Sequence, residues 1–596
     1  MDRLAAGDNA RNATRNRPPM ISYRITPADL HAHLYQVTVS VPHPAAEQAL
    51  SLPVWIPGSY LVREFARHLS AVSASQGRRE VPLRQADKAT WIAQCEGRGA
   101  LVVTYTVYAF DTSVRAAYLD ADRGFFNGTS VCLRVHGREA EPHRLELARL
   151  PRGWDIATSM PPAGPRGVFE AAGYDELVDH PVELGRFWRG TFKAGGVPHE
   201  FIVAGALPDF DGDRLLADTR RICEAQIAFW HGKKKPPFKR YVFLLNGVDD
   251  GYGGLEHRAS TALIAARRDL PQRGRTELSD GYVTLLGLIS HEYFHTWNVK
   301  RLRPGEFARY DYTQENYTSL LWFFEGFTSY YDDQFLLRTG LIDPARYLKL
   351  VAKTVTGVLA MPGRHVQTVA QASFDAWVKY YRGDENTPNA TISYYTKGAL
   401  VALAIDLTLR HEGRGTLDDV MHGLWSRSEG GSISEADIVA VLQAVAGRSM
   451  ADELAAWVHG TADLPLQKLL VRVGVNWTVQ APTLAQRLGL RVSEGPLTGI
   501  KVQSVLRGGA GEAAGLSAGD ELLAVNDWRV RRLDDAVRLL PASGAVELLV
   551  VRDGRVRRFP AWVPDAAEAG AVTLALTPAA NTPAGALELR RAWLPD

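Results

Sequence analysis

Cysteine is scarce in this sequence. The 596 residues include three cysteines, Cys95, Cys132 and Cys223, which lie far apart along the chain. Their number and spacing fit neither a disulfide framework nor a CxxC metal site. We expect the three side chains to be small buried hydrophobic groups, which agrees with a reducing compartment.

Long apolar runs are also missing. No segment approaches the roughly 18 to 20 apolar residues of a membrane-spanning helix. Residues 1–20 are polar, lack the apolar core of a secretory signal and are expected to form a disordered lead-in. The sequence therefore predicts a cytoplasmic protein with no membrane partner, although a chain that begins after a removed signal would look the same.

Neither sign of charge dominates. Lysine and arginine number 68 against 66 for aspartate and glutamate, a net charge of +2. A nucleic-acid-binding surface needs a strong basic bias, so we expect no nucleic-acid partner. Apolar residues at 46% and charged residues at 22% are ordinary for a globular protein. A chain of this length exceeds what one hydrophobic core supports, so several domains are expected.

The hydrophobic pattern changes along the chain and predicts three domains. Residues 21–190 form short alternating segments broken by proline and glycine, typical of an all-β, sandwich-like domain. Residues 191–465 begin with strands and become helical, an α+β arrangement. Residues 470–565 combine short strands, one helix and glycine-rich turns, and residues 566–596 form a tail without an assigned structure. The expected helices of the central domain cover residues 213–230, 278–297, 317–338, 393–410 and 434–445.

An HExxH motif, His291 to His295, is the first candidate for a catalytic site. Two histidines four residues apart lie on one face of a helix, so both imidazoles can bind one metal ion. Glu292 falls beside that face, where it can accept a proton from water at the metal. So short a motif also arises by chance, and a zinc centre needs a third protein ligand beside an open position.

Glu325 is the candidate for that third ligand. It lies 30 positions after His295, inside the apolar and aromatic segment LLWFFEGFTSYYDD. A buried carboxylate without a partner is costly, whereas one that binds a metal ion is not. A glutamate facing water is the alternative, and the upstream motif argues against it. Because two histidines and one glutamate form a known catalytic zinc set, we predict one zinc ion per chain.

Two further segments fit around this centre. Gly253 and Gly254 permit close approach of a ligand to the backbone, and Glu256 could then pair with a charged substrate amine. A glycine turn with a solvated glutamate agrees equally well with these residues. Downstream, Tyr394 and Tyr395 open a helix. A tyrosine hydroxyl can donate a hydrogen bond to an oxyanion, although a tyrosine there more often serves packing.

These segments resemble the glycyl aminopeptidase family, gluzincin metallopeptidases with a thermolysin-like catalytic domain and a C-terminal PDZ domain. The resemblance covers most of the chain and rests on YGGLEHRAST, HEYFHTWNVKRLRP, ENYTSLLWFFEGFTSYY and SYYTKGAL, in this order. In the last module AGLSAGDELLAVND carries the likeness to PDZ domains. The resemblance implies a non-catalytic leading domain, a thermolysin-like domain over 191–465 and a PDZ domain over 470–565.

The resemblance also implies site roles. His291, His295 and Glu325 would bind zinc, and Glu292 would be the general base. Glu256 would bind the α-amine of a peptide with a free N-terminus, next to Gly253 and Gly254. Tyr395 would stabilise the oxyanion, with Tyr394 as the adjacent alternative. The family further implies a preference for N-terminal glycine or alanine, which no residue explains by itself.

The last module offers a second binding site. A PDZ-like module binds a peptide C-terminus by strand addition, and we expect amides near Leu488, Gly489 and Leu490 to hold the carboxylate. Two other functions stay open: a zinc endopeptidase of the same fold, and a peptide-binding scaffold without turnover. The intact set of ligands and base argues against the scaffold. The sequence leaves the oligomeric state open.

Overall fold

The structure is a computed structural model that describes residues 20–495, 497–540, 542–566 and 572–595. The expected disordered lead-in lies, apart from Met20, outside the described residues. Contacts divide the chain into two compact units, and each unit is described by itself. The first consists of Met1–Arg220, Lys234–Leu285 and Asp311–Glu315; the second of Arg221–Lys233, Leu286–Tyr310 and Asn316–Asp596.

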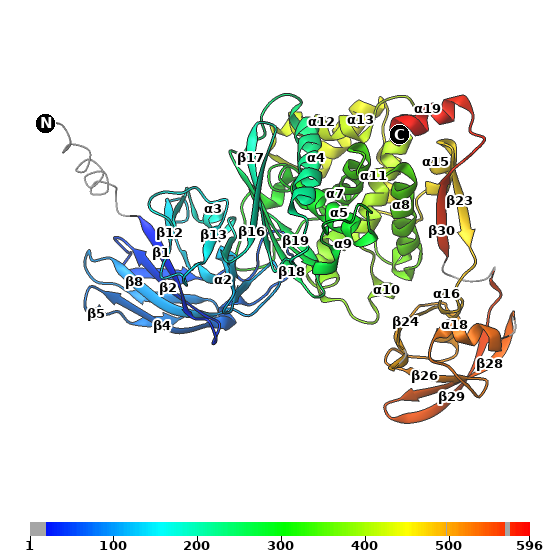
Figure 1. Cartoon of the computed structure of the whole chain (residues 1–596), viewed down its shortest axis with the longest axis horizontal. Coiled ribbons are helices and arrows are strands. Elements are labelled where there is room, and N and C mark those ends of the chain that lie inside the picture. Colours follow the sequence, from blue (N-terminus) through cyan, green and yellow to red (C-terminus); the bar gives the residue numbers. More distant parts are fainter. Residues whose placement is uncertain (1–19, 496, 541, 567–571, 596) are drawn as a thin grey trace. The chain divides into compact units, whose positions relative to one another are not determined.

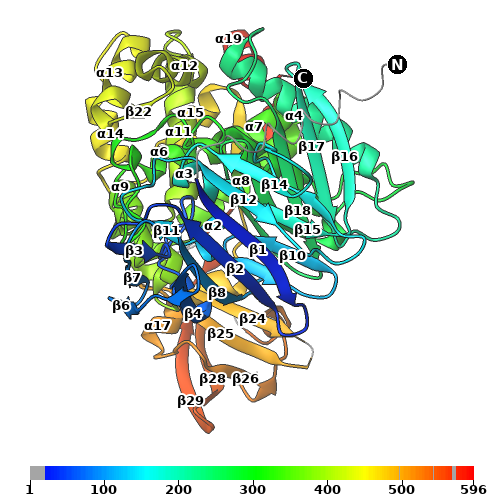
Figure 2. The ribbon, with the colours of Figure 1, turned by 90° about the vertical axis from the view of Figure 1, so that its left-hand side faces the viewer.

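Strands form most of the N-terminal part of the first unit. A seven-stranded sheet has the order β14-β12-β1-β2-β8-β4-β5, and its central strands lie side by side in Figure 2. Along β2 and β8 buried side chains alternate with more exposed ones, as in a sheet with one covered face. The strands are β1 (Ile21–Asp29), β2 (Leu34–Val41), β4 (Leu69–Gln76), β5 (Arg79–Glu80), β8 (Leu101–Tyr108), β12 (His143–Leu147) and β14 (Val168–Ala171).

Two four-stranded sheets complete this part of the unit, which confirms the expected β-rich domain. Their orders are β13-β15-β10-β9 and β11-β3-β7-β6. The first contains β9 (Ala117–Leu119), β10 (Arg123–Phe126), β13 (Asp155–Ala157) and β15 (Val182–Gly185). The second contains β3 (Glu47–Ser51), β6 (Leu83–Gln85), β7 (Thr90–Gln94) and β11 (Arg134–Val135).

A five-stranded sheet of order β16-β17-β18-β20-β19 also belongs to the first unit. β17, β18 and β20 run parallel, and almost every residue of β18 is buried, as expected for a parallel strand covered on both faces. β19 pairs antiparallel with β20 and ends at Glu256. The strands are β16 (Trp188–Ala194), β17 (Val197–Ala204), β18 (Tyr241–Val248), β19 (Tyr252–Glu256) and β20 (Ser260–Ala266).

Helices make up the centre of the chain, and α7, α8 and α11 lie side by side in Figure 1. The five expected helices are all present, with ends that differ by a few residues. They are α4 (Gly212–His231), α5 (Asp280–Phe294), the pair α6 (Leu321–Phe324) and α7 (Gly326–Arg338), α11 (Tyr394–His411) and α13 (Glu435–Ala446). Further helices include α8 (Pro344–Leu359), α10 (Thr387–Ala390), α12 (Leu417–Ser428), α14 (Ala451–Trp457) and α15 (Leu466–Arg472).

The C-terminal module contains a sheet of order β24-β25-β26-β28-β29, with β27 paired to β26. Its core is built from aliphatic side chains such as Leu488, Ile500 and Leu548. The elements are α16 (Leu484–Leu488), β24 (Leu490–Gly495), β25 (Gly499–Val505), α17 (Ala510–Ala513), β26 (Glu521–Val525), β27 (Trp528–Arg529), α18 (Leu533–Ala536), β28 (Gly544–Arg552) and β29 (Arg555–Val563). The sequence-based domain boundaries stay a prediction.

The tail, which the sequence left unassigned, has its own secondary structure. β30 (Thr573–Pro578) pairs antiparallel with β23 (Val475–Gln480), and this ribbon is separate from the sheet of the C-terminal module. α19 (Ala584–Trp593) follows and buries Trp593. Its indole Nε1 donates a hydrogen bond to Tyr330 Oη at 3.3 Å. The tail therefore packs against the helices of the second unit.

Two expectations from composition can be compared with the structure. Cys95, Cys132 and Cys223 are buried free thiols, which confirms their interpretation as small hydrophobic groups. Among the described residues, no helix is both long enough and apolar enough to cross a membrane.

Candidate metal centre

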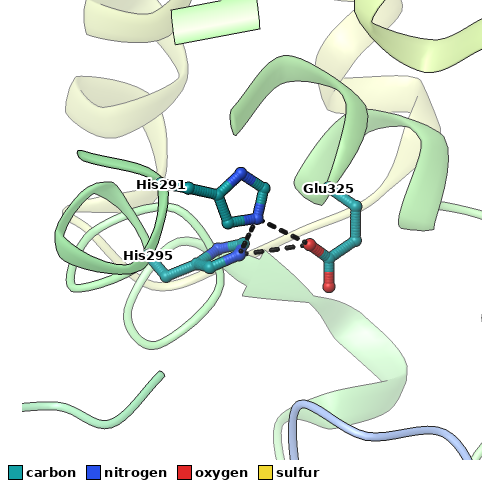
Figure 3. A group of neighbouring side chains, drawn as sticks. All are labelled: His291, His295 and Glu325. Carbon is teal, nitrogen blue, oxygen red and sulfur yellow. Dashed lines mark hydrogen bonds and ion pairs between the residues drawn. The ribbon is translucent and has the colours of Figure 1, made fainter. Parts of the chain in front are cut away.

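The two motif histidines come from the end of α5. His291 lies in the last turn, and His295 follows the helix, its N–H donating to the carbonyl oxygen of His291 at 3.2 Å. Because four residues make about one helical turn, both imidazoles point the same way. Their Nε2 atoms are 3.0 Å apart, and both face Glu325 (Figure 3).

The other ring nitrogens fix the protonation of both imidazoles. His291 Nδ1 is 3.0 Å from Asp332 Oδ2, and His295 Nδ1 is 2.8 Å from the carbonyl oxygen of Asn298. A carbonyl oxygen and an ionised carboxylate only accept, so both Nδ1 atoms carry the proton. In the neutral rings both Nε2 atoms then present lone pairs to each other. Such a pair is stable only with a cation between them, and this hydrogen-bonding arrangement is typical of metal-binding histidines.

Glu325 completes a triangle of donor atoms. It joins α6 to α7 and is 1% exposed. Its Oε2 lies 3.1 Å from His295 Nε2 and 3.6 Å from His291 Nε2. Donor atoms about 2.1 Å from a tetrahedral zinc ion lie about 3.4 Å apart, so all three edges fit one small cation. Within the described residues these three side chains form a group with ligand atoms in metal-binding reach.

The charges of the centre also suit a cation. Burial raises the pKa of Glu325, but the positive charge of His295 and hydrogen bonds with both histidines outweigh it and lower the pKa to about 2. Burial lowers the pKa of His291, and hydrogen bonds to Asp332 and Glu325 outweigh it and raise that pKa. The carboxylates thus favour positive charge in this pocket, and a divalent metal ion between neutral imidazoles would supply it.

Two glycines bring Glu325 and Tyr395 to the same place. A Cβ added to Gly326 would lie 2.5 Å from the Cα of Gly398, and one added to Gly398 would lie 2.5 Å from the carbonyl oxygen of Trp322. The backbones of α7 and α11 therefore touch, which only glycine allows. Each glycine follows closely on a candidate site residue. The sequence did not predict this crossing, and its trace in the sequence is a glycine inside each of two apolar helices.

Tyr395 lies beside the centre. Its ring centroid is 6.2 Å from that of His291, and it also contacts the rings of Tyr380 and Tyr394 at 5.4 and 4.7 Å. Burial and the nearby charge of Glu325 raise the pKa of Tyr395 well above its usual value, so the hydroxyl stays a donor. Tyr394, by contrast, is fully buried. Tyr395 thus makes the ring contact with His291.

Glu292 and Asp332 flank the histidines. Glu292 is on α5, is 5% exposed, and adds its charge to those that raise the pKa of His291. Asp332, which the sequence analysis did not select, orients His291 from α7. It lies seven residues after Glu325, a spacing that puts both on one face of a helix. This spacing from Glu325 is the feature of the sequence from which Asp332 could have been predicted.

Glu256, Gly253 and Gly254 belong to the first unit, whereas the three candidate ligands belong to the second. Glu256 ends β19 and is 4% exposed. A Cβ added to Gly58 would lie 2.5 Å from both carboxylate oxygens of Glu256, so the carboxylate packs directly on that glycine. The carbonyl oxygen of Gly254 accepts a hydrogen bond from Arg115 Nη2 at 3.3 Å. Gly58 is a neighbour that the sequence did not indicate.

The residues expected to hold a peptide carboxylate join α16 to β24. Leu488 is buried at the helix end, Gly489 adopts a φ of 67°, and Leu490 starts the strand. The N–H of Gly489 donates to carbonyl oxygens of α16, so a carboxylate at this amide would compete with a helix cap. β24 is at the edge of its sheet, the position that strand addition requires.

Comparisons with known proteins agree with this architecture. The family profiles that match describe a peptidase M61 N-terminal domain over residues 22–186, an M61 glycyl aminopeptidase over 284–401 and a PDZ domain over 476–551. No match is found among curated proteins.

Solved structures add a close relative. An aminopeptidase N family protein from Idiomarina loihiensis is 36% identical, covers 97% of this chain and 100% of its own, and superposes with a TM-score of 0.90. An M1 zinc metallopeptidase from Deinococcus radiodurans is 15% identical over 75% of this chain and 94% of its own, with a TM-score of 0.45. The identity and coverage of the first relative show that this chain belongs to the M61 glycyl aminopeptidase family of peptidases.

Proposed function

We propose that this peptidase is a zinc-dependent aminopeptidase that removes N-terminal residues, preferably glycine or alanine, from peptides. One observation carries the metal assignment: His291 Nε2, His295 Nε2 and Glu325 Oε2 form a triangle with edges of 3.0, 3.1 and 3.6 Å. The protons at both Nδ1 atoms leave the Nε2 lone pairs for the ion. Two imidazoles and one carboxylate suit zinc, and one such set supports one ion per chain.

In the proposed mechanism the metal ion and three side chains each have one role. Zinc, when bound, acts as a Lewis acid that polarises a carbonyl group and acidifies water. Glu292 accepts the proton of the attacking water and passes it to the leaving amine. The hydroxyl of Tyr395 donates a hydrogen bond to the oxyanion of the tetrahedral intermediate. Asp332 keeps His291 in the tautomer and orientation that the ligand set needs.

Restriction to the N-terminus is assigned to Glu256. Its buried carboxylate can pair with the ammonium group of a free N-terminus, with Gly253 and Gly254 leaving room for the substrate backbone. An internal peptide bond brings no ammonium to this carboxylate. An endopeptidase of the same fold would not need that pairing, so the two functions differ in their dependence on a free amine.

A panel of reporters tests both the function and this pairing. We expect hydrolysis of glycyl and alanyl reporters that stops on treatment with a chelator and returns with zinc. N-acetylated reporters should be poor substrates. Efficient cleavage of N-blocked peptides would favour the endopeptidase, and a chain that binds zinc but cleaves nothing would favour the scaffold.

The same panel is run on Glu256→Gln, which keeps the volume that packs on Gly58. Loss of one partner from a buried charge pair costs about 2 to 5 kcal/mol, so kcat/KM for free-amine reporters should fall by about 30-fold or more. The small activity on N-acetylated reporters should change much less. Equal losses on both classes would remove the exopeptidase assignment and leave the metal site untouched.

For the PDZ domain we propose that a peptide C-terminus adds to the edge of β24, with its carboxylate near Leu488, Gly489 and Leu490. The negatively charged C-terminal carboxylate of the peptide would accept hydrogen bonds from these backbone amides. A labelled peptide should therefore bind more tightly than the same peptide with an amidated C-terminus. Equal affinity of the two peptides would contradict this groove.

A further inference from the structure

The outer edge of β19 carries the candidate amine site. β19 is the last strand of its five-stranded sheet, next to β20. The N–H of His257 donates to the carbonyl oxygen of Ser260, which makes these two residues a hydrogen-bonded pair of the antiparallel ladder. Hydrogen-bonded and non-hydrogen-bonded pairs alternate, so the backbone groups of Glu256 and Gly254 point away from β20. A peptide backbone can therefore add to β19 at these two residues.

Arg115 reaches the same edge from the leading β-rich domain. It precedes β9 and belongs, like Glu256, to the first unit. Its Nη2 donates to the carbonyl oxygen of Gly254 at 3.3 Å, and a Cβ added to Gly253 would lie 3.7 Å from its Nη1. The guanidinium group therefore lies beside the two glycines of β19, which have no side chain to separate it from the edge of the strand.

The guanidinium group of Arg115 has donors available for a ligand. Among the described residues it makes no ion pair, and its Nε is buried without a hydrogen-bond partner. Its Nη1 makes no hydrogen bond with these residues either, but this atom is accessible to solvent. An arginine typically pairs with a carboxylate through two parallel hydrogen bonds, and here it makes one bond to a neutral carbonyl group. A carboxylate at the edge of β19 would complete its hydrogen bonding.

We infer that Arg115 binds the C-terminal carboxylate of a dipeptide whose ammonium group lies at Glu256, so that dipeptides are preferred substrates. The inference rests on the proposed amine-binding role of Glu256. Gly254 and Glu256 are two residues apart on a strand, a rise of about 7 Å, and an extended dipeptide has about the same length. The negative charge of Glu256 and the positive charge of Arg115 thus match the two charges of a dipeptide that runs antiparallel to β19.

The test compares alanyl-alanine with alanyl-alaninamide, which has the same shape and no carboxylate. Hydrogen bonds between charged groups are the strong ones, so kcat/KM should be about 10- to 100-fold higher for the acid, mainly through a lower KM. Tetra-alanine and its amide should differ little, because their C-terminus lies about 7 Å farther along the edge. Equal kcat/KM for the two dipeptides, or the same preference for the acid in the tetrapeptides, would overturn the inference.

Two variants then assign the preference to Arg115. Arg115→Met removes the guanidinium group and should lower kcat/KM for alanyl-alanine much more than for alanyl-alaninamide. Equal losses on both substrates would mean that Arg115 only supports the backbone of β19, and would overturn the inference. Arg84→Met makes the same change at an exposed arginine of β6 in the same unit and should keep the preference for the acid.

A binding measurement separates this inference from the proposed function. Glu292→Gln, a variant without the general base, is expected to bind peptides without cleaving them. Isothermal titration on this variant should give at least about 10-fold tighter binding of alanyl-alanine than of its amide. Equal affinities would overturn the inference. Failure of the proposed function would be seen instead as an unmodified protein that cleaves no alanyl reporter, while the preference in binding persists.

Discussion

Glu292→Gln is expected to keep its zinc and lose nearly all turnover. The amide has the size of the carboxylate but cannot accept a proton from water or return it to the leaving amine. General acid–base catalysis contributes about 100- to 10,000-fold, so kcat on an alanyl reporter should fall by that range. Glu292 is not one of the three donors around the cation position, so metal content should stay near one ion per chain. Turnover and metal analysis of the same preparation measure both quantities.

Two further variants serve as controls for Glu292→Gln. Glu277→Gln makes the same change at an exposed residue just before α5 and should leave turnover unchanged. Glu325→Gln weakens a metal ligand, so it should lose zinc together with activity. Substantial turnover by Glu292→Gln with a full complement of zinc would exclude Glu292 as the general base. Loss of zinc from Glu292→Gln would show instead that this carboxylate supports the metal.

The sequence predicts the helices in the centre of the chain well because their signals are local. The apolar periodicity around residues 278–297 places the HExxH motif on a helix, and α5 is found there. A spacing of four residues defines a shared face without any knowledge of the fold. The role of Glu325 could also be predicted from the sequence, because a lone carboxylate in an aromatic segment needs a buried cationic partner.

Local sequence patterns do not predict contacts between segments that are distant along the chain. The pairing of β23 with β30 joins residues about a hundred positions apart, and neither strand signals its partner. The crossing of α7 and α11 depends on Gly326 and Gly398, whose spacing along the chain carries no information about contact. Asp332 is intermediate, because its helical spacing from Glu325 can be found in the sequence but its hydrogen bond to His291 cannot.

The structure is also needed to choose between Tyr394 and Tyr395 as the oxyanion donor. Neighbouring residues on a helix point about 100° apart, so one of them can face the metal centre while the other faces the core. The sequence does not say which, because both side chains are equally apolar and equally able to donate. In the structure Tyr395 contacts His291 and is partly exposed, whereas Tyr394 is fully buried.

Tyr395→Phe is therefore expected to lower kcat by about 100- to 1000-fold, the usual effect of losing one oxyanion donor. KM should change little, because the hydrogen bond forms in the transition state and not with the bound substrate. Tyr394→Phe is the matched control: the same atom is removed one residue earlier, at a ring that packs in the core, and kcat should stay within a few-fold of the unmodified enzyme. Steady-state kinetics on an alanyl reporter measure both variants. If the loss fell on Tyr394→Phe instead, the oxyanion donor would be Tyr394, and if neither variant lost activity, the oxyanion would need no tyrosine at all.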